Sequence, residues 1–298
     1  MSDLRALLGN AALRLSVAGM DSPRLDARLL LAHATGVPPD ALIGSIELTP
    51  QALERFESFL ARRMLREPVA YIIGKREFWS LEFEVGPGVL IPRPETETLI
   101  EQVIEAFPDR SMALCFVDLG VGSACLLAAC LSEYSKARGV GIDSSEKALS
   151  WAGRNIGKLG FFDRSRLELD AWDAISVPMA DVILSNPPYV RSEDIPLLAQ
   201  DVRLFEPLSA LDGGEDGLDA YRALAPLIRR LLKPEGLAFL EIGAGQDEAV
   251  PAILEAKGLQ TIRIAPDLAG IRRCVVTARN LGNPGKIEKT VGTTAQNR

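Results

Sequence analysis

Residues 113–124 read ALCFVDLGVGSA, an apolar run that ends in an aspartate and two closely spaced glycines. The run over residues 113–119 is typical of a buried strand, and the pattern that follows predicts a helix over residues 123–136. Glycines between a strand and a helix let the backbone turn sharply and let a ligand approach it closely. The stretch therefore predicts a strand, a ligand-binding turn and a helix, although an ordinary tight turn gives a similar pattern.

Strands and helices alternate from about residue 95 onward. Apolar runs that indicate strands lie at residues 113–119, 139–142, 181–185, 237–242, 259–264 and 273–278, with a further strand at residues 166–169. Helical patterns lie between them at residues 123–136, 145–158, 217–232 and 246–257. Alternation of this kind predicts an α/β fold, in which a parallel sheet carries helices on both faces.

The first part of the chain carries helical signals instead. Helix starts at Asp21-Ser-Pro and at Thr49-Pro50 predict a small helical domain over residues 1–72. Residues 73–94 are predicted to form a β-hairpin linker with its turn at Gly86-Pro87-Gly88. The α/β domain then covers residues 95–280, and the polar residues 281–298 are predicted to be a disordered tail.

Composition excludes several classes of function. The chain has 298 residues, with 33 Lys and Arg against 40 Asp and Glu, so its formal net charge is −7. Such an acidic chain is poorly suited to follow a nucleic acid backbone, although a local basic patch is compatible with this charge. With one histidine and four cysteines that form no CxxC pair, neither a metal site nor a Ser-His-Asp triad is expected.

No secretory signal opens the chain, and glycines interrupt the apolar stretch at residues 111–131. We therefore expect a cytoplasmic protein with no membrane segment, and we expect it to be a monomer.

The glycine loop is closer to one cofactor class than to another. A dinucleotide fingerprint needs Gly or Ala three residues after the second glycine, where this chain has Cys125. The stretch from Asp118 to Ala124 resembles more closely the Asp/Glu-x-Gly-x-Gly-x-Gly loop of S-adenosylmethionine (SAM) methyltransferases.

Two other acidic residues follow expected strands. Asp143 ends residues 139–143, where it can accept hydrogen bonds from both hydroxyls of a ribose. Its alternative role is to cap the next helix, for which Ser144 serves equally well. Asp170 can accept a hydrogen bond from an adenine amine, and Trp172 can pack on the ring or belong to the core.

The sequence Asn186-Pro187-Pro188-Tyr189 directly follows the expected strand at residues 181–185. Two prolines fix the chain as it leaves the sheet and remove two N–H donors, which leaves carbonyl oxygens as acceptors. Asn186 adds a side-chain carbonyl, and Tyr189 adds a flat aromatic face. Together they predict a pocket that accepts both hydrogens of a planar NH2 group; an ordinary Pro-Pro turn is the alternative.

An amide or exocyclic amine is a weak nucleophile because its lone pair is delocalised. Holding such a nitrogen in line with a sulfonium methyl group, about 3–3.5 Å away, contributes on the order of 7–11 kcal/mol. Carbonyl acceptors also stabilise the positive charge that grows on the nitrogen. We therefore predict Asn186, Pro187, Pro188 and Tyr189 as both the catalytic and the substrate-binding residues.

The chain as a whole resembles the release factor glutamine methyltransferases, the HemK/PrmC family, over about residues 20–280. The resemblance rests on residues 186–189 and on blocks elsewhere: PRLDA (23–27), LLLAH (29–33), EPVAYIIG (67–74), REF (76–78), VLIPRPETE (89–97), EPLSAL (206–211), GGEDG (213–217), YR (221–222), EIG (241–243) and Gln246. It implies a helical N-terminal domain, a β-hairpin linker and a seven-stranded, Rossmann-like SAM-dependent domain.

The same resemblance implies the reaction. It implies methylation of the side-chain amide nitrogen of the glutamine in the Gly-Gly-Gln motif of peptide chain release factors 1 and 2, without direct contact to nucleic acid. The residues expected to bind SAM are Asp118, Gly120, Val121, Gly122, Ser123, Ala124, Asp143, Asp170, Trp172, Asn186 and Glu97. Glu97 would bind the ammonium group of SAM, or would simply place a favourable charge at a helix N-terminus.

Some residues depart from the family pattern. Val121 and Ala124 stand where the family usually has Thr and Gly, and Asp170-Ala-Trp172 replaces a direct Asp-Trp pair. Two alternatives use the same Asn-Pro-Pro-Tyr chemistry: an amino-methyltransferase that acts on a flipped nucleic acid base, and one that acts on a ribosomal protein glutamine. Val121 and Ala124 suggest a third alternative, a SAM-binding or SAM-free interaction module that has lost catalysis.

Overall fold

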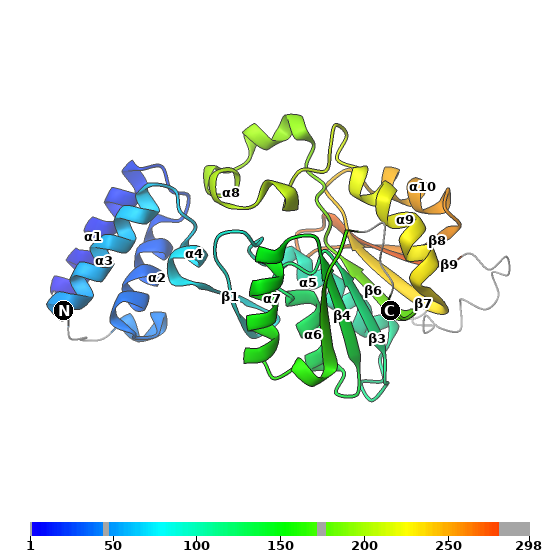
Figure 1. The fold of residues 1–298 in the computed structure, drawn as a ribbon. Coiled ribbons are helices and arrows are strands. Elements are labelled where there is room, and N and C mark those ends of the chain that lie inside the picture. The colour runs from blue at the N-terminus through cyan, green and yellow to red at the C-terminus, as the bar shows by residue number, and fades with distance from the viewer. Residues whose placement is uncertain (1, 44–47, 172–176, 280–298) are drawn as a thin grey trace, which may run out of the picture. The chain divides into compact units, whose positions relative to one another are not determined.

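The apolar runs from residue 115 onward form one sheet in the computed structural model, which describes residues 2–43, 48–171 and 177–279 (Figure 1). Within these residues the sheet has seven strands in the order β5-β4-β3-β6-β7-β9-β8. The strands are β3 (Cys115–Leu119), β4 (Arg138–Asp143), β5 (Ser165–Leu169), β6 (Ala180–Ser185), β7 (Leu232–Glu241), β8 (Leu259–Pro266) and β9 (Arg272–Arg279).

Pairing within the sheet is mixed. Strands β3 to β7 pair in parallel, as the alternation predicts, whereas β9 pairs antiparallel with both β7 and β8. The prediction of a parallel sheet is therefore wrong for β9. The connection from β8 to β9 spans only residues 267–271, and so short a connection joins antiparallel strands but cannot cross over to a parallel one.

Helices cover both faces of the sheet, which confirms the predicted α/β fold (Figure 1). They are α5 (Glu97–Ala106), α6 (Cys125–Glu133), α7 (Glu146–Lys158), α9 (Asp219–Leu231) and α10 (Ala249–Glu255). Phe116 and Phe239 pack with α5, α6 and α7 in one buried cluster, while Val117 and Ala238 pack with α9 and α10 in another. This alternation of neighbouring residues between two faces is the period of a β-strand.

A second compact unit is helical, which confirms the predicted N-terminal helices. It comprises the described parts of residues 1–75 together with residues 85–87 and 198–206. Its helices are α1 (Ser2–Val17), α2 (Pro23–Thr35), α3 (Pro50–Met64), α4 (Val69–Ile73) and α8 (Gln200–Phe205). Leu15, Leu30 and Phe56 are fully buried in its core. The start of α3 is fixed by the hydroxyl of Thr49, which accepts a hydrogen bond from the Ala52 N–H at 3.2 Å.

A buried ion pair ties α8 into this helical unit. The Arg63 guanidinium donates through Nε to Asp26 Oδ2 at 2.8 Å, and its Nη1 lies 3.4 Å from Asp201 Oδ2. Arg63 is 8% exposed and Asp26 is 6% exposed. Charges this deeply buried need a partner. Residues 198–206 therefore belong to the helical unit, although the residues on either side of them in the chain belong to the other unit.

The hairpin that the sequence predicts consists of β1 (Lys75–Phe78) and β2 (Leu81–Glu84), but its turn lies elsewhere. Trp79 and Ser80 form the turn, with φ angles of 52° and 57°. The Trp79 backbone N–H donates to the Glu97 carboxylate at 2.7 Å, and the indole N–H donates to Glu133 at 2.7 Å. Gly86-Pro87-Gly88 is therefore not the turn of this hairpin, because these long-range bonds stabilise a left-handed turn without glycine at residues 79–80.

Short 3-10 helices complete the described chain: η1 (Pro39–Ile43), η2 (Pro94–Thr96), η3 (Phe162–Arg164), η4 (Ser192–Leu197) and η5 (Leu208–Ala210). None of the helices in the described ranges is both long and apolar enough to cross a membrane. The predicted tail at residues 281–298 lies outside the described residues, as does Trp172.

Candidate active site

A cavity of about 340 Å³ lies at the carboxyl ends of β3, β4 and β6. Open α/β sheets bind their ligands at this edge. The glycine loop after β3, Asp143 at the end of β4, and Asn186, Pro187 and Pro188 after β6 all line it. The structure therefore brings together residues from three of the motifs that the sequence analysis singled out.

The glycine loop is held by the neighbouring strand. The N–H groups of Gly120 and Val121 both donate to the Ile142 carbonyl oxygen at 2.9 Å, and the Gly122 N–H donates to Asp143 Oδ2 at 2.9 Å. The φ angles of Gly120 and Gly122 are 81° and 54°, a region that glycine enters without steric cost. Residues 120–123 all line the cavity.

Ala124 occupies a left-handed position directly before α6, with φ 65°. It is fully buried and does not line the cavity. A residue with a Cβ atom loses about 1–2 kcal/mol in this conformation, a cost that glycine avoids. Alanine at residue 124, where the family usually has glycine, therefore affects the backbone of the loop and not the cavity wall.

Asp118 lies at the base of the glycine loop with its carboxylate sealed from solvent. It is 1% exposed, and neither carboxylate oxygen has a hydrogen-bond partner within the described chain. Burial raises the pKa of Asp118 to about 7. Asp118 does not itself line the cavity, so the structure places it beneath the loop and not against the cavity space.

Asp143 lies on the cavity wall and is not the cap of the following helix. Its Oδ1 accepts a hydrogen bond from the Ser145 N–H at 2.9 Å. The cap of α7 is Ser145, whose hydroxyl accepts from the Ala148 N–H at 3.2 Å, so the alternative in which Asp143 or Ser144 caps the helix is wrong. Burial raises the pKa of Asp143 despite the N–H groups that it accepts.

Asp170 is half-buried and does not line the cavity, whereas its neighbour Ala171 does. The Asp170 N–H donates to the Asp143 carbonyl oxygen at 3.1 Å, which continues the pairing of β4 and β5. Its predicted contact with an adenine amine stays a prediction, and so does that of Trp172.

The side-chain amide of Asn186 has a defined orientation. Its Nδ2 group donates to the Thr96 hydroxyl at 3.1 Å, and both residues line the cavity. Because an amide NH2 group only donates and an amide oxygen only accepts, this bond leaves Oδ1 as the acceptor of Asn186. Pro187 and Pro188 continue the cavity wall from Asn186.

Tyr189 borders a second cavity, of about 350 Å³, together with Gly243 and Gln246. Its hydroxyl donates to Glu241 Oε1 at 3.2 Å, and its carbonyl oxygen accepts from Gln246 Nε2 at 3.2 Å. Residues 186–188 therefore line the first cavity, while Tyr189 lines the second.

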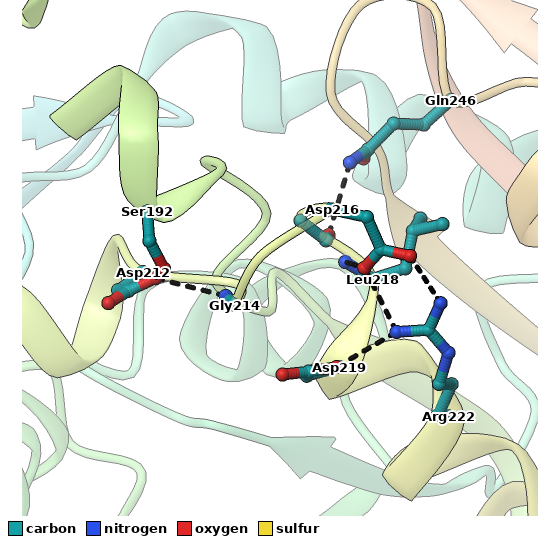
Figure 2. A network of polar contacts seen from close by, with 9 residues as sticks. Ser192, Asp212, Gly214, Asp216, Leu218, Asp219, Arg222 and Gln246 are labelled. Atoms are coloured by element: carbon teal, nitrogen blue, oxygen red, sulfur yellow. Dashed lines mark hydrogen bonds and ion pairs between the residues drawn. The ribbon is translucent and has the colours of Figure 1, made fainter.

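A loop of residues 211–217 packs closely against residues 188–190 and supports this segment. Polar contacts within this loop, and from Arg222 and Gln246 to it, hold the loop in place (Figure 2). Gln246 Nε2 donates to the Gly217 carbonyl oxygen at 3.1 Å, and the Arg222 guanidinium bonds Asp216 and Asp219. A Cβ atom on Gly217 would lie 2.5 Å from the Tyr189 carbonyl oxygen. A Cβ atom on Gly213 would likewise lie 2.8 Å from the Pro188 carbonyl oxygen, so close backbone packing requires glycine at both positions of the GGEDG block.

Glu97 is not a lining residue of the first cavity. Its carboxylate accepts the Trp79 backbone N–H, so the structure assigns it to the hairpin turn. It also stands in the first turn of α5, where its charge is favourable to the helix dipole.

Several lining residues were missed by the sequence analysis: Gly88, Val89, Leu90, Pro92, Arg93, Thr96, Pro207, Ser209 and Ala210. Residues 89–91 look like part of a strand, because apolar residues that line a cavity give the same pattern as buried ones. Thr96 carries no motif of its own, and only its place in the block of residues 89–97 singled it out.

Comparisons with known proteins show which proteins this chain is similar to. A family profile described as the PrmC N-terminal domain matches residues 6–74. A release factor glutamine methyltransferase of Caulobacter vibrioides is 43% identical over 270 residues, covering 90% of this chain and 93% of the relative. One from Cereibacter sphaeroides is 44% identical over 264 residues, covering 88% of this chain and 93% of the relative.

Among solved structures, a methyltransferase from Pyrococcus furiosus superimposes with a TM-score of 0.50 at 16% identity, covering 75% of this chain and 98% of that one. A likeness at this identity supports the fold alone, whereas the two relatives match most of the sequence at more than 40% identity. This chain therefore belongs to the release factor glutamine methyltransferase family and is a methyltransferase.

Proposed function

We propose that this protein transfers a methyl group from SAM to the side-chain amide nitrogen of the glutamine in the Gly-Gly-Gln motif of peptide chain release factors 1 and 2. Family membership supports the reaction class. The observation that carries the proposal is the orientation of the Asn186 side-chain amide. Its NH2 group donates to the Thr96 hydroxyl, so its carbonyl oxygen is the acceptor on the cavity wall.

The residues around the first cavity fit SAM. Ligand pockets are typically about 300–1,000 Å³, and this cavity is about 340 Å³. Among the residues that the structure describes, the buried Asp118 carboxylate has no hydrogen-bond partner, and such a group favours donors or positive charge close by. We propose that residues 120–123, Asp143 and Asn186 hold SAM, with Asp118 and Ala124 acting from beneath the loop.

When bound, SAM supplies an electrophilic methyl group on its sulfur. The chain's own contribution is orientation, because an amide nitrogen is too weak a nucleophile to react from an arbitrary direction. We propose that Asn186 Oδ1 accepts one N–H of the substrate amide and that a backbone carbonyl of residues 186–188 accepts the other. These acceptors also stabilise the positive charge that grows on the nitrogen during transfer.

Tyr189 is the fourth predicted substrate residue. Its ring lies against Gly243, since a Cβ atom there would come within 3.0 Å of Tyr189 Cδ2. We propose that this fixed ring forms one side of the path by which the glutamine side chain reaches Asn186.

The test is a methylation assay with radiolabelled SAM and intact release factor 1 or 2. We expect label on the wild-type factor and none when the glutamine of the Gly-Gly-Gln motif is replaced by alanine. Label that persists on the alanine variant contradicts the proposed target.

The same assay, run on duplex DNA and on purified ribosomal proteins, separates the alternatives. Label on DNA, together with tight and salt-sensitive binding, points to a base amino-methyltransferase. Label on a ribosomal protein points to a different glutamine. If calorimetry detects no SAM binding, the chain has lost catalysis.

A further inference from the structure

A buried carboxylate lies behind the residues that line the first cavity. Glu241, the last residue of β7, is 1% exposed and belongs to neither the glycine loop nor the Asn-Pro-Pro-Tyr segment. Its Oε2 accepts the Thr96 hydroxyl at 2.5 Å, and its Oε1 accepts the Tyr189 hydroxyl at 3.2 Å. Thr96 is 2% exposed and in turn accepts the Asn186 Nδ2 group at 3.1 Å.

The chemistry of these groups fixes the direction of each bond. An ionised carboxylate only accepts, so the single proton of the Thr96 hydroxyl is committed to Glu241. Thr96 can then meet Asn186 only as an acceptor, which requires the NH2 group of Asn186 to face it. The opposite rotamer, with Oδ1 toward Thr96, would place two acceptors against each other without a proton between them.

We propose that Thr96 and Glu241 are positioning residues that hold the side-chain amide of Asn186 in one orientation. Glu241 holds both ends of the Asn-Pro-Pro-Tyr segment, because it reaches Asn186 through Thr96 and bonds Tyr189 directly. A flipped Asn186 would present its own donors to the donor N–H groups of a substrate amide, so methyl transfer would be slower. This kinetic consequence rests on the proposed function. The orientation itself rests only on the bonds described.

Three variants test the kinetic consequence. Thr96→Val keeps the shape of the side chain and removes the hydroxyl, Thr96→Ser keeps the hydroxyl, and Thr98→Val changes a nearby buried threonine of α5 that is outside this chain of bonds. Assays are run at pH 8, above the pKa of about 7 to which burial raises Glu241, so that the carboxylate is ionised.

For Thr96→Val we expect kcat to fall by about tenfold to 100-fold, with Kd for SAM within about threefold of wild type, since orientation is lost but the SAM cavity is kept. Thr96→Ser is expected to restore kcat to within about threefold of wild type. Thr98→Val is expected to match wild type. Wild-type kcat in Thr96→Val, or no rescue by Thr96→Ser, overturns the proposal.

A second measurement needs no substrate. Asn186 is one of six asparagines in the chain, so labelling asparagine with 15N gives a small set of side-chain NH2 signals in an NMR spectrum. The Asn186 pair is assigned by its loss in Asn186→Asp. We expect this pair to move in Thr96→Val and to stay in place in Thr98→Val.

An unmoved Asn186 pair in Thr96→Val means that the bond to Thr96 does not set the amide, and it overturns the proposal whatever the substrate. If wild-type protein fails to methylate a release factor while the pair moves as expected, the proposed function fails and the positioning role stands. Circular dichroism shows that each variant is folded; if Thr96→Val is not, Thr96→Ala takes its place in both measurements.

Discussion

Asp118 combines a stability cost with a predicted functional role. One pKa unit corresponds to about 1.4 kcal/mol. Because burial raises the pKa of Asp118 from 3.8 to about 7, ionisation of this carboxyl lowers the free energy of unfolding by roughly 4 kcal/mol. A raised pKa favours the folded state below pH 4, and this contribution is lost as the pH rises through 7.

We therefore expect Asp118→Asn to raise the free energy of unfolding at pH 8, by at most about 4 kcal/mol, and to raise it less at pH 5. The same variant should bind SAM more weakly, because the charge beneath the loop is gone. Urea unfolding and calorimetry measure the two effects, with the exposed Asp163→Asn as the control. A variant less stable than wild type at pH 8 contradicts the account.

Ala124 permits a second test at a single residue. Glycine avoids the left-handed strain of φ 65°, and this gain offsets the lost methyl group and the greater freedom of the unfolded chain. We expect Ala124→Gly to change the free energy of unfolding by no more than about 1 kcal/mol in either direction.

The matched control is Ala128→Gly, at a buried position of α6. There the backbone is helical, and glycine should cost about 1 kcal/mol or more. If thermal or urea unfolding gives equal decreases in the free energy of unfolding for the two variants, Ala124 is not strained.

At the residue scale, the sequence places the glycine loop, Asp143 and Asn186 because each follows a strand end, and strand ends converge in a parallel sheet. It does not place Thr96 and Glu241 against Asn186. Thr96 and Glu241 are 145 positions apart in the chain, and only the fold joins them. Nor does the sequence distinguish the two roles predicted for Glu97, binding the SAM ammonium group or placing a favourable charge at a helix N-terminus, since an acidic residue at the start of a helix is compatible with both.

At the element scale, the hairpin turn depends on side chains from two helices. Glu97 on α5 accepts the Trp79 N–H, and Glu133 on α6 accepts the indole N–H. We expect Glu97→Ala to lower the free energy of unfolding by about 1–3 kcal/mol, because it leaves a half-buried N–H without its charged acceptor.

The same variant tests whether Glu97 binds SAM, as predicted, or only holds the hairpin turn, as its contact with Trp79 indicates. If Glu97 only holds the hairpin, Kd for SAM measured by calorimetry stays within about threefold of wild type, a change of less than 1 kcal/mol. Glu101→Ala, at an exposed position of the same helix, is the control for both measurements. A large loss of SAM affinity, with an unchanged free energy of unfolding, would show that Glu97 binds SAM.

Most elements follow from local patterns. Strands β3, β6 and β8 and helices α7 and α9 lie close to their predicted ranges, because their apolar periodicity is strong. The hairpin turn does not follow, since Gly86-Pro87-Gly88 carries the composition of a turn and Trp79-Ser80 does not. The antiparallel β9 does not follow either, because its residues are as apolar as those of a parallel strand.

At the scale of the whole molecule, the helical unit depends on a buried charge with partners from distant stretches of the chain. Arg63 and Asp201 are 138 positions apart. We expect Arg63→Met to lower the free energy of unfolding of this unit by about 3–5 kcal/mol, because Asp26 is left buried without its partner. Urea unfolding, followed by circular dichroism, measures the loss.

The neighbouring Arg62→Met is the matched control. Arg62 is 40% exposed and pairs with Glu67 near the surface, where an ion pair contributes at most about 1 kcal/mol. Similar losses for the two variants would mean that the burial of Arg63 is not what makes its pair important.

The helical unit is made of separate stretches of the chain, which limits the fragments of this protein that can fold by themselves. A fragment that stops at Lys75 lacks Asp201 and the helix that carries it, and a fragment that starts at Arg76 contains that helix without the residues it packs on. Neither half is a complete folding unit, and after a single protease nick in the hairpin the N-terminal helices are held to residues 198–206 by noncovalent contacts such as the Arg63–Asp201 ion pair.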